Sequence, residues 1–381
     1  MPFGFEIRDD LSTEQLAVMW SDLEQRSDAS FFQSWQWIGC WIAEAGLRPV
    51  TLVGRAEGRV VLLGVLVPTD RRDVLPFAIH GLHLHTTGDI DRDIITIEYN
   101  GFLADRDYAG AATAALRYLL TGVAVGARRR DELHLKGMAT TLDLPGIGGE
   151  AICTELSRKP SWRVDIEAVR AAGTGYLDSL SANTRQQIRR AMRLYEKRGP
   201  LTATRARDQG EALAFLDELK TLHQRYWTGR GEPGAFSYPF FERFQRRMIE
   251  TGLDSGAVEI IRVAAGAHVI GYVYNFVYRG TALAYQTGIA YEDDAKLKPG
   301  LVSHALCIDL HLREGGRVYD FMAGAARYKA SLGKPGPDMV YYLLERPTLP
   351  LRIESVLRTL KHRLFGARPV RAATPQVAEP D

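Results

Sequence analysis

The spacing of apolar residues along the chain predicts short helices and strands in alternation. Leu11–Gln25 places apolar residues every three or four positions behind Ser12 or Thr13, the pattern of a capped helix. Residues 49–68 hold two β-branched runs around Glu57-Gly58, the pattern of a β-hairpin. By the same criteria, the rest of the first half has helices at 31–46 (capped by Ser34) and 109–125 and strands at 93–103, 131–138 and 162–166.

The second half repeats this mixture in a clearer order: helices, three strands separated by glycine turns, a helix and a strand. Two similarly ordered α+β units are therefore expected, with a boundary between residues 155 and 175. A proline-rich tail from about Gly366 is expected to be disordered. The predicted helices are 180–199 (capped by Ser181 or Asn183), 211–227, 237–252 and 300–316, and the strands are 257–264, 268–280, 281–290 and 317–322.

Composition narrows the class of protein. A chain of 381 residues exceeds what one core usually holds, and a net charge of +2 argues against general coating of nucleic acid. Cys40, Cys153 and Cys307 are odd in number and widely spaced, which excludes a disulfide framework and fits a reducing cytoplasm. No apolar run is long enough to span a membrane, and the acidic N-terminus does not resemble a signal peptide.

Basic residues mark two candidate anion sites. Arg185, Arg189 and Arg193 share one face of the predicted helix 180–199, where they repel one another unless an anion lies opposite. Two interpretations stay open here: a solvated or internally paired face, and a surface for a cofactor phosphate or an RNA end. Lys296 and Lys298 precede Pro299-Gly300 at a helix start, which suits phosphate, although a plain loop also fits.

Histidines suggest one binding site and argue against a metal. His223 and Trp227 share a helix face before a glycine-rich loop, a pattern of substrate-covering segments, although a helical histidine is more often structural. His83 and His85, with His80 nearby, imitate a metal site but lack a zinc-protease-like motif and a suitably spaced carboxylate, so no metal is expected. The sequence contains no phosphate-binding loop, no dinucleotide-binding glycine motif, no serine nucleophile elbow and no kinase motif set. ATP hydrolysis, dinucleotide redox chemistry and serine hydrolysis are therefore disfavoured.

Four segments of the second half together resemble a known family: "SANTRQQIRRAMRLYEKRGPL", "LHQRYWTGRGEPGAF", "KLKPGLVSHALCIDLHLREGG" and "RVYDFMAGAARYKASLG". They are similar to the GNAT-like acyltransferase domain of the CelD/BcsL type, related to the FemAB/FemX peptidyltransferases. The first half is similar through "FFQSWQWIGCWIAEAG" and "IEYNGFLAD". The resemblance covers roughly residues 10 to 350.

The resemblance implies tandem GNAT-like units, each a mixed, mostly antiparallel sheet flanked by helices. It implies domains at 1–165 and 166–350, followed by a C-terminal helix and a disordered tail at 351–381. The implied activity is N-acyl transfer, with acetyl the expected group, from acyl-CoA to an amine on a small molecule or a carbohydrate or envelope precursor. When Gly300 is taken as the first glycine of the family's acyl-CoA-binding loop, this chain has Leu297 where the family has a basic residue and Val302 where it has a second glycine. Lys296 and Lys298 would supply the positive charge from other positions of the loop.

The resemblance also suggests roles for single residues. Lys329 would stabilise the developing charge, Tyr328 would protonate the leaving group, and Asp320 would act as base or orient the amine. A backbone N–H near Gly288 would hold the oxyanion, and Tyr285 on the same strand would contact substrate. The alternatives are a FemAB-like aminoacyl-tRNA-dependent peptidyltransferase, whose arginine face would meet the tRNA acceptor end, and a catalytically inactive scaffold for polysaccharide assembly.

Overall fold

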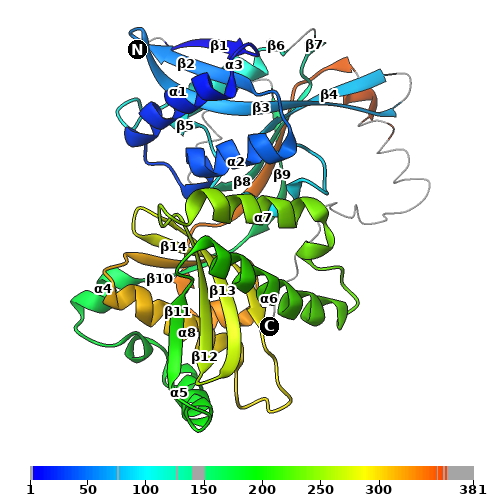
Figure 1. Ribbon diagram of the computed structural model, residues 1–381. Helices are drawn as coiled ribbons and strands as arrows, with labels where there is room; N and C mark the ends of the chain where they lie inside the picture. Colours follow the sequence, from blue (N-terminus) through cyan, green and yellow to red (C-terminus); the bar gives the residue numbers. More distant parts are fainter. Residues whose placement is uncertain are drawn as a thin grey trace. The chain divides into compact units, whose positions relative to one another are not determined.

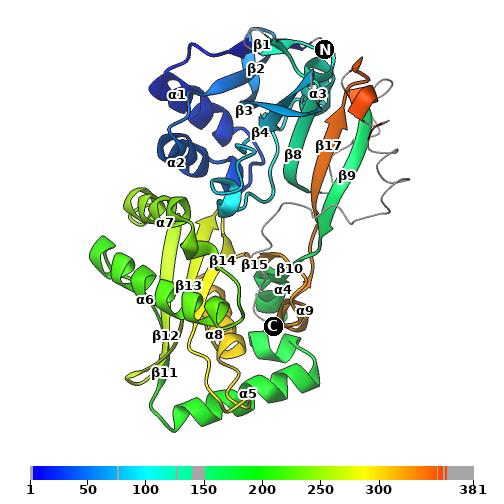
Figure 2. The ribbon, with the colours of Figure 1, turned by 90° about the vertical axis from the view of Figure 1, so that its right-hand side faces the viewer.

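The computed structural model describes residues 3–74, 77–125, 128–139, 151–349, 351–354 and 357. The chain forms two compact units (Figures 1 and 2). Of the described residues, unit 1 holds those up to Arg158 together with those from Met339 onward, and unit 2 holds Lys159–Asp338. Each unit is a mixed, mostly antiparallel sheet flanked by helices, as the sequence predicted. No helix in the described part of the chain is long and apolar enough to cross a membrane.

The sheet of unit 1 has the strand order β1–β2–β3–β4–β8–β17–β9, with β5 paired to β3 beside it. β4 and β8 form a parallel pair, through Gly81–His83 and Glu132–His134. Glu57 and Gly58 both have positive φ between β2 and β3, the requirement of a tight hairpin turn, which confirms the predicted hairpin. The strands are β1 (Gly4–Arg8), β2 (Val50–Ala56), β3 (Arg59–Val74), β4 (Phe77–Leu84), β5 (Leu103–Ala104), β8 (Glu132–Ala139), β9 (Ile152–Lys159) and β17 (Met339–Glu345), with a separate β6 (Ala124–Val125) and β7 (Arg128–Arg129) hairpin.

Helices flank this sheet, and two of them begin at predicted caps. Ser12 and Gln15 form a reciprocal capping box at the start of α1 (Thr13–Gln25). Ser34 caps α2 (Trp35–Ala45), which ends at Gly46 in the left-handed conformation. The alanine-rich helix is α3 (Ala111–Leu120). The three helices are thus confirmed, with boundaries shifted by a few residues.

The predicted strand at 93–103 is wrong. This segment contains a short 3-10 helix, Asp93–Ile95, and its only strand is β5 at Leu103–Ala104. The carboxylate of Asp93 accepts hydrogen bonds from the backbone of Thr87 and Gly88, which folds the segment back on itself. Thr96 and Tyr99 then adopt positive φ, so the β-branched pattern does not continue as an extended chain.

The sheet of unit 2 has the order β11–β12–β13–β14–β15–β10–β16. The predicted three-stranded meander is present as β12, β13 and β14, which lie side by side in Figure 1. β14 and β15 are parallel, and β10 is antiparallel to β15. The strands are β10 (Ser161–Asp165), β11 (Leu201–Arg205), β12 (Val258–Ala265), β13 (His268–Tyr278), β14 (Thr281–Ile289), β15 (Val318–Ala323) and β16 (Lys334–Pro335).

The helices of unit 2 pack a continuous apolar core on this sheet. α8 buries Val302, Ala305 and Ile308 in one cluster with Ile188 of α5 and Phe321 of β15. Ser181 caps α5, and Pro239 begins α7, as predicted. The helices are α4 (Ile166–Ala171), α5 (Ala182–Glu196), α6 (Gln209–Thr228), α7 (Pro239–Gly252), α8 (Pro299–Arg313) and α9 (Arg327–Leu332), with 3-10 turns at Phe31–Gln33 in unit 1 and at Tyr176–Ser179 and Ala235–Ser237 in unit 2.

The two sheets have the same plan, but the sixth strand of each comes from a distant part of the chain. In unit 1, β8 pairs with β17, whose residues follow all of unit 2 in the sequence (Figure 2). In unit 2, β15 pairs with β10, which precedes the rest of that sheet. The predicted domain limits at 165 and 350 therefore differ from this grouping, because β10 belongs to unit 2 and β17 to unit 1. Of the predicted C-terminal segment 351–381, only 351–354 and 357 lie within the described residues.

Candidate active site

A gap between two parallel strands opens inside unit 2. β14 and β15 pair only through Thr281–Leu283 and Val318–Asp320. Beyond these residues β14 continues to Ile289 and β15 to Ala323 without further pairing between them. The register of β14 against β13 shifts at the same place: Ala284 lies opposite Asn275 and Gln286 opposite Tyr274, so Tyr285 is the extra residue of a bulge. A bulge of this kind bends a strand, so it accounts for the separation of β14 from β15.

Lys329 lies at the end of β15, next to this gap. The helix α9 follows the strand after a short turn at Gly324, and it buries Lys329 to 2% exposure. The Nζ atom of Lys329 donates a hydrogen bond to the carbonyl of Ala323, at 2.9 Å. A buried ammonium group exerts a strong field on nearby groups, because little water screens it.

Tyr328 stacks on a histidine that the sequence analysis did not single out. The rings of Tyr328 and His304 lie 5.4 Å apart with their planes at 11°. Nδ1 of His304 is 3.2 Å from the hydroxyl of Tyr319, and the imidazole is buried. Burial, followed by the charge of Lys329, lowers the pKa of His304 to about 3, so this imidazole is neutral at physiological pH. In the sequence, His304 could have been singled out as a polar residue among the apolar positions of α8.

Asp320 is buried at the last position where β15 pairs with β14. One carboxylate oxygen accepts a hydrogen bond from the backbone N–H of Met322, at 2.6 Å. Met322 has a φ of 62°, an unfavourable conformation for this residue that the surrounding contacts must maintain. Asp320 therefore shapes the end of the strand, whatever part it takes in proton transfer. The structure brings all three predicted catalytic residues to one end of β15.

The predicted substrate residues Tyr285, His223 and Trp227 belong to one cluster of rings. His223 contacts Trp227 and Phe236, Phe236 contacts Phe241, and Phe241 lies parallel to Tyr285. Gln245 of α7 donates a hydrogen bond to the hydroxyl of Tyr285, at 3.3 Å. Burial lowers the pKa of His223 to about 4, which keeps the imidazole neutral. The cluster is thus apolar, with a few polar atoms inside it.

The predicted cofactor residues divide into an exposed group and a packed one. Lys296 and Lys298 are exposed before α8, and Lys298, with a φ of 45°, is its N-cap. Gly300 has open space around it, so a ligand has access to this helix end. Gly288 lies elsewhere, against α6: a Cβ atom there would come within 2.4 Å of the carbonyl oxygen of Leu219. Close helix–strand packing therefore accounts for this glycine independently of any oxyanion role.

Acidic residues share the loop between β14 and α8 with the two lysines. Glu292 pairs with Arg198 at 2.9 Å and lies 3.2 Å from His268. Asp293 and Asp294 follow it and line a cavity of about 450 Å³ beside the loop. This loop departs from what a GNAT-like fold leads us to expect, because its carboxylates would repel a pyrophosphate bound at the start of α8.

The arginine face of α5 has partners of its own. Arg189 forms an ion pair with Asp178 at 2.7 Å, and Arg185 donates to the carbonyl of the same residue. Arg193 is exposed. Within the described part of the chain, Arg185 and Arg189 contact the turn before α5 and do not contact β14, β15 or α9. The paired-face interpretation therefore accounts for Arg185 and Arg189, while Arg193 remains available at the surface.

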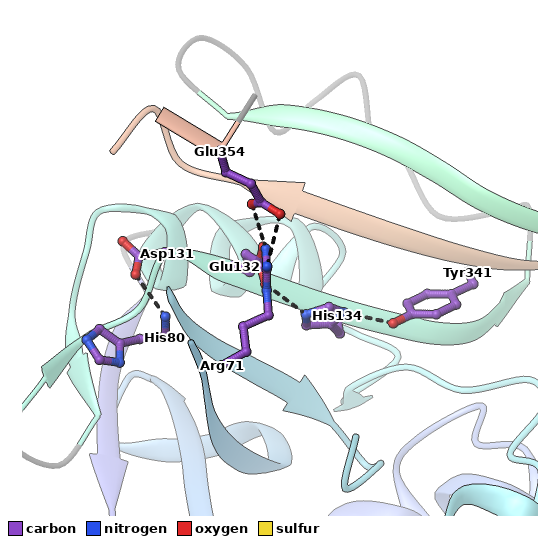
Figure 3. A network of polar contacts seen from close by, with 7 residues as sticks. All are labelled: Arg71, His80, Asp131, Glu132, His134, Tyr341 and Glu354. Atoms are coloured by element: carbon purple, nitrogen blue, oxygen red, sulfur yellow. Dashed lines mark hydrogen bonds and ion pairs between the residues drawn. The ribbon is translucent and has the colours of Figure 1, made fainter. Parts of the chain in front are cut away.

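The histidines that imitate a metal site, His80, His83 and His85, each have a different environment. His80 pairs with Asp70, His85 with Asn100, and His83 stacks on His134 with ring centroids 4.1 Å apart. Figure 3 shows the network around them: Arg71 lies between Glu132 and Glu354, and His134 connects Glu132 to the hydroxyl of Tyr341. Burial opposes the ionised form of Glu132, but hydrogen bonds from His134 and Arg71 lower its pKa to about 2. No group of three or more metal-ligating side chains gathers among the described residues.

Comparison with known proteins shows that part of this chain is similar to a known family. Residues 182–330 match the family model of the acetyltransferase (GNAT) domain. This segment includes α5 to α8, β14, β15 and the start of α9, and therefore the strand gap with Asp320, Tyr328 and Lys329. No curated protein sequence is detectably similar to the chain.

Solved structures share the fold of the whole chain at low sequence identity. FemX is similar with a TM-score of 0.57 and 12% identity, over 92% of this chain and 99% of that one. The C-terminal domain of a putative lysylphosphatidylglycerol synthetase from Agrobacterium fabrum has a TM-score of 0.50 and 12% identity, over 94% and 99%. L-PGS from Bacillus licheniformis has a TM-score of 0.50 and 12% identity, over 92% and 97%. The resemblance to GNAT and FemX-like proteins is confirmed at the level of fold, and the CelD/BcsL type stays a prediction.

Proposed function

We propose that the protein is an N-acyltransferase that moves an acyl group, with acetyl as the expected group, from acyl-CoA to an amino group. The amine belongs to a small molecule or to a carbohydrate or envelope precursor, and the reaction takes place in the cytoplasm. The observation that carries the proposal is the gap between β14 and β15, with a buried lysine, a tyrosine and a carboxylate at one end of β15. The GNAT family match over 182–330 supports the same class of reaction.

The chemistry of the gap follows from the charges that acyl transfer develops. The amine nitrogen attacks the thioester carbonyl, and Asp320 accepts the proton that the nitrogen loses. The carbonyl oxygen becomes an oxyanion, which the ammonium group of Lys329 stabilises. When the carbon–sulfur bond breaks, Tyr328 protonates the leaving thiolate. The proton on Asp320 then passes to solvent and Tyr328 takes one back from solvent, which restores both groups. The products are the amide and free CoA thiol.

Recognition of the two substrates is assigned to different residues. Lys296, Lys298 and the open helix start at Gly300 would contact the CoA phosphates, because helix N-termini and lysines both favour anions. The ring cluster around Tyr285, His223 and Trp227 would contact the acceptor. Aromatic rings combined with a few polar atoms suit an amine on an apolar or sugar-like body.

Binding and turnover tests separate the parts of this proposal. A ligand that binds the folded state raises the melting temperature, so CoA and short-chain acyl-CoAs should each increase it. Release of free thiol from acetyl-CoA in the presence of a panel of amines would then report transfer. Absence of both effects, with the same protein well folded, would count against acyl-CoA as the donor.

A FemAB-like aminoacyl-tRNA-dependent peptidyltransferase is the second candidate. The exposed Arg193 on α5 favours it, because its guanidinium group is available to contact a tRNA phosphate. Binding of tRNA with a steep dependence on salt would support this reading, since phosphate neutralisation releases counterions. A third candidate, an inactive scaffold for polysaccharide assembly, would bind a partner but turn over no acyl donor.

A further inference from the structure

A cavity of about 580 Å³ opens at one edge of unit 2, away from the strand gap, and we call it the Glu259 cavity. Gly280, in the turn before β14, lines this cavity, and the backbone N–H of Arg317, just before β15, donates to the carbonyl of Gly280 at 2.7 Å. The gap and Lys329 lie at the opposite ends of the same two strands. The cavity is therefore separate from the candidate active site, and its volume is in the usual range for a small-molecule site.

Glu259 is a buried carboxylate in the wall of this cavity, with 5% of its surface exposed. The side-chain amide of Asn275 donates to its Oε1 atom at 2.7 Å, Nε2 of His311 lies 2.7 Å from the same atom, and Nε of Arg205 donates to Oε2. Burial opposes the ionised form of Glu259, but hydrogen bonds and charges of His311 and Arg205 lower its pKa to about 2. The cavity thus has a permanent negative charge in its wall.

The wall of the Glu259 cavity has more carboxylates than cations. Arg205 is shared between two of them, because it also pairs with Glu314 at 2.7 Å. Arg207 pairs with Glu211 at 3.0 Å, and its side chain is 80% exposed. Asp254 is exposed and forms no ion pair in the described part of the chain. With the paired Arg207 set aside, three lining carboxylates share one guanidinium group, so the wall is negative even when its histidine is protonated.

Two helices end at the cavity and add partial negative charge. α7 ends at Gly252 and the next two residues line the cavity, while α8 ends at Arg313 and the next three residues line it. The last carbonyl groups of a helix have no partner within the helix, and the helix dipole is negative at this end. Arg170 donates to the carbonyls of Leu312 and Gly316, which shows that the end of α8 attracts cations.

A buried acceptor behind Glu259 lacks a donor. Asn275 is fully buried, and its Oδ1 atom accepts no hydrogen bond from the described residues, whereas its Nδ2 atom is occupied by Glu259. Val277 lines the cavity, and residues two apart on a strand share one face, so the side chain of Asn275 points to the same side. A buried acceptor without a donor is unfavourable. A ligand rich in N–H groups and free of acceptors would complement this wall.

We propose that the Glu259 cavity binds an organic cation of the linear polyamine type. The negative groups lie around the wall and at two helix ends rather than converging on one point, so charges separated along a flexible chain fit them better than a compact ion does. No three potential metal ligands gather among the described residues, and the carboxylate of Glu259 already has three donors, so a metal ion would lack ligands here. The proposed acyl transfer uses none of these residues, so this would be a second binding site.

Calorimetry with spermidine on the full chain tests the proposal without a catalytic assay. Asp254→Asn combined with Glu314→Gln removes two charges from the wall and should weaken the dissociation constant at least about tenfold, as expected for lost charged hydrogen bonds. Both positions are exposed, so the fold should be retained. Wild-type binding should weaken as salt is added. The uncharged 1,8-octanediol, of similar length, should not bind.

Asp28→Asn combined with Glu155→Gln is the matched control. It removes two exposed carboxylates from unit 1 and therefore changes the net charge by the same amount. Its dissociation constant for spermidine should stay within about twofold of wild type. No binding of spermidine to wild type, wild-type affinity in the cavity variant, or an equal loss of affinity in the unit 1 control would overturn the proposal.

Spermidine carries amino groups that the proposed active site would also accept, so Tyr285→Ala is measured beside these variants. It should keep wild-type affinity for spermidine. Lost affinity in Tyr285→Ala, with wild-type affinity in the cavity variant, would assign spermidine to the active site and refute the cavity site. Binding that depends on Asp254 and Glu314, with no acyl transfer to any amine, would refute the transferase and leave the cavity site intact.

Discussion

The ring of Tyr328 lies parallel to the ring of His304, with centroids 5.4 Å apart and planes at 11°. The next residue, Lys329, is buried on the carbonyl of Ala323, and its charge contributes to keeping His304 neutral. The tyrosine and the lysine are thus held by different partners, one by an aromatic face and one by a backbone oxygen. Substitution at one position should leave the other in place, so their roles are separable.

Lys329 gives the most direct test of the proposed chemistry. Lys329→Met keeps most of the buried packing and removes the charge, and turnover should fall about a hundredfold with little change in KM, as for a lost oxyanion donor. Lys329→Arg should recover part of the rate. Tyr328→Phe should cost less, because it keeps the stack on His304. Near-wild-type single-turnover rates in a folded Lys329→Met variant would show that the lysine is structural.

The loop before α8 tests the donor phosphate contact. Replacing Lys296 and Lys298 together with glutamate puts two reversed charges beside a helix start, which should cost about 2 kcal/mol of CoA binding. The dissociation constant measured by calorimetry should therefore rise about thirtyfold. Both residues are exposed, so the melting temperature should stay near wild type. An unchanged dissociation constant would place the phosphates elsewhere.

The arginine face of α5 distinguishes a ligand surface from a paired one. Substituting glutamine at Arg185, Arg189 and Arg193 preserves helix propensity and removes three charges. If this face meets a phosphate-bearing donor, activity should be lost while the circular dichroism spectrum and melting temperature are retained. Arg185 and Arg189 contact Asp178, so the triple variant also removes contacts within the protein. The single variant Arg193→Gln leaves those contacts in place and should be measured beside it. Wild-type rates in both variants would leave the arginines as a solvated face.

Buried neutral histidines should make the protein sensitive to acid. Burial lowers the pKa of His83 and His304 to about 3, and of His85 and His223 to about 4. In the unfolded chain these groups take up protons below about pH 6.5. The unfolded state therefore binds more protons, and stability should fall as the pH drops from about 6.5 towards 4. Urea midpoints measured at pH 7, 5.5 and 4.5 should decrease steadily; a flat profile would contradict these environments.

Local signals in the sequence predicted most elements of unit 2 and several of unit 1. Helix caps at Ser12, Ser34 and Ser181 are side-chain contacts within three residues, so a sequence displays them directly. The turn at Glu57-Gly58 is similarly local. By contrast, the fold-back at 93–103 depends on Asp93 binding backbone groups five and six residues earlier, which no hydrophobic pattern reveals.

The candidate site was predictable only in part, because its geometry comes from distant segments. The Tyr328-Lys329 pair and Asp320 are close in sequence, and the structure places them at one end of β15. His304 comes from α8, and its contact with Tyr319 and Tyr328 requires the packing of the helix on the sheet. The sequence suggested a functional role for Gly288, but the backbone of Leu219 in α6 packs directly against it, and this close packing explains why the residue is glycine.

The pairing of β8 with β17 has a consequence for how the chain is made. About two hundred residues separate the end of β8 from the start of β17, so a ribosome synthesises all of unit 2 before unit 1 can complete its sheet. Until then the edge of β8 is open, and an unpaired strand edge is a template for wrong pairing. Unit 2, whose strand β10 is made first, can close early. Folding of unit 1 is therefore tied to the last part of translation, and a chain that stops short of residue 339 would leave its first unit unfinished.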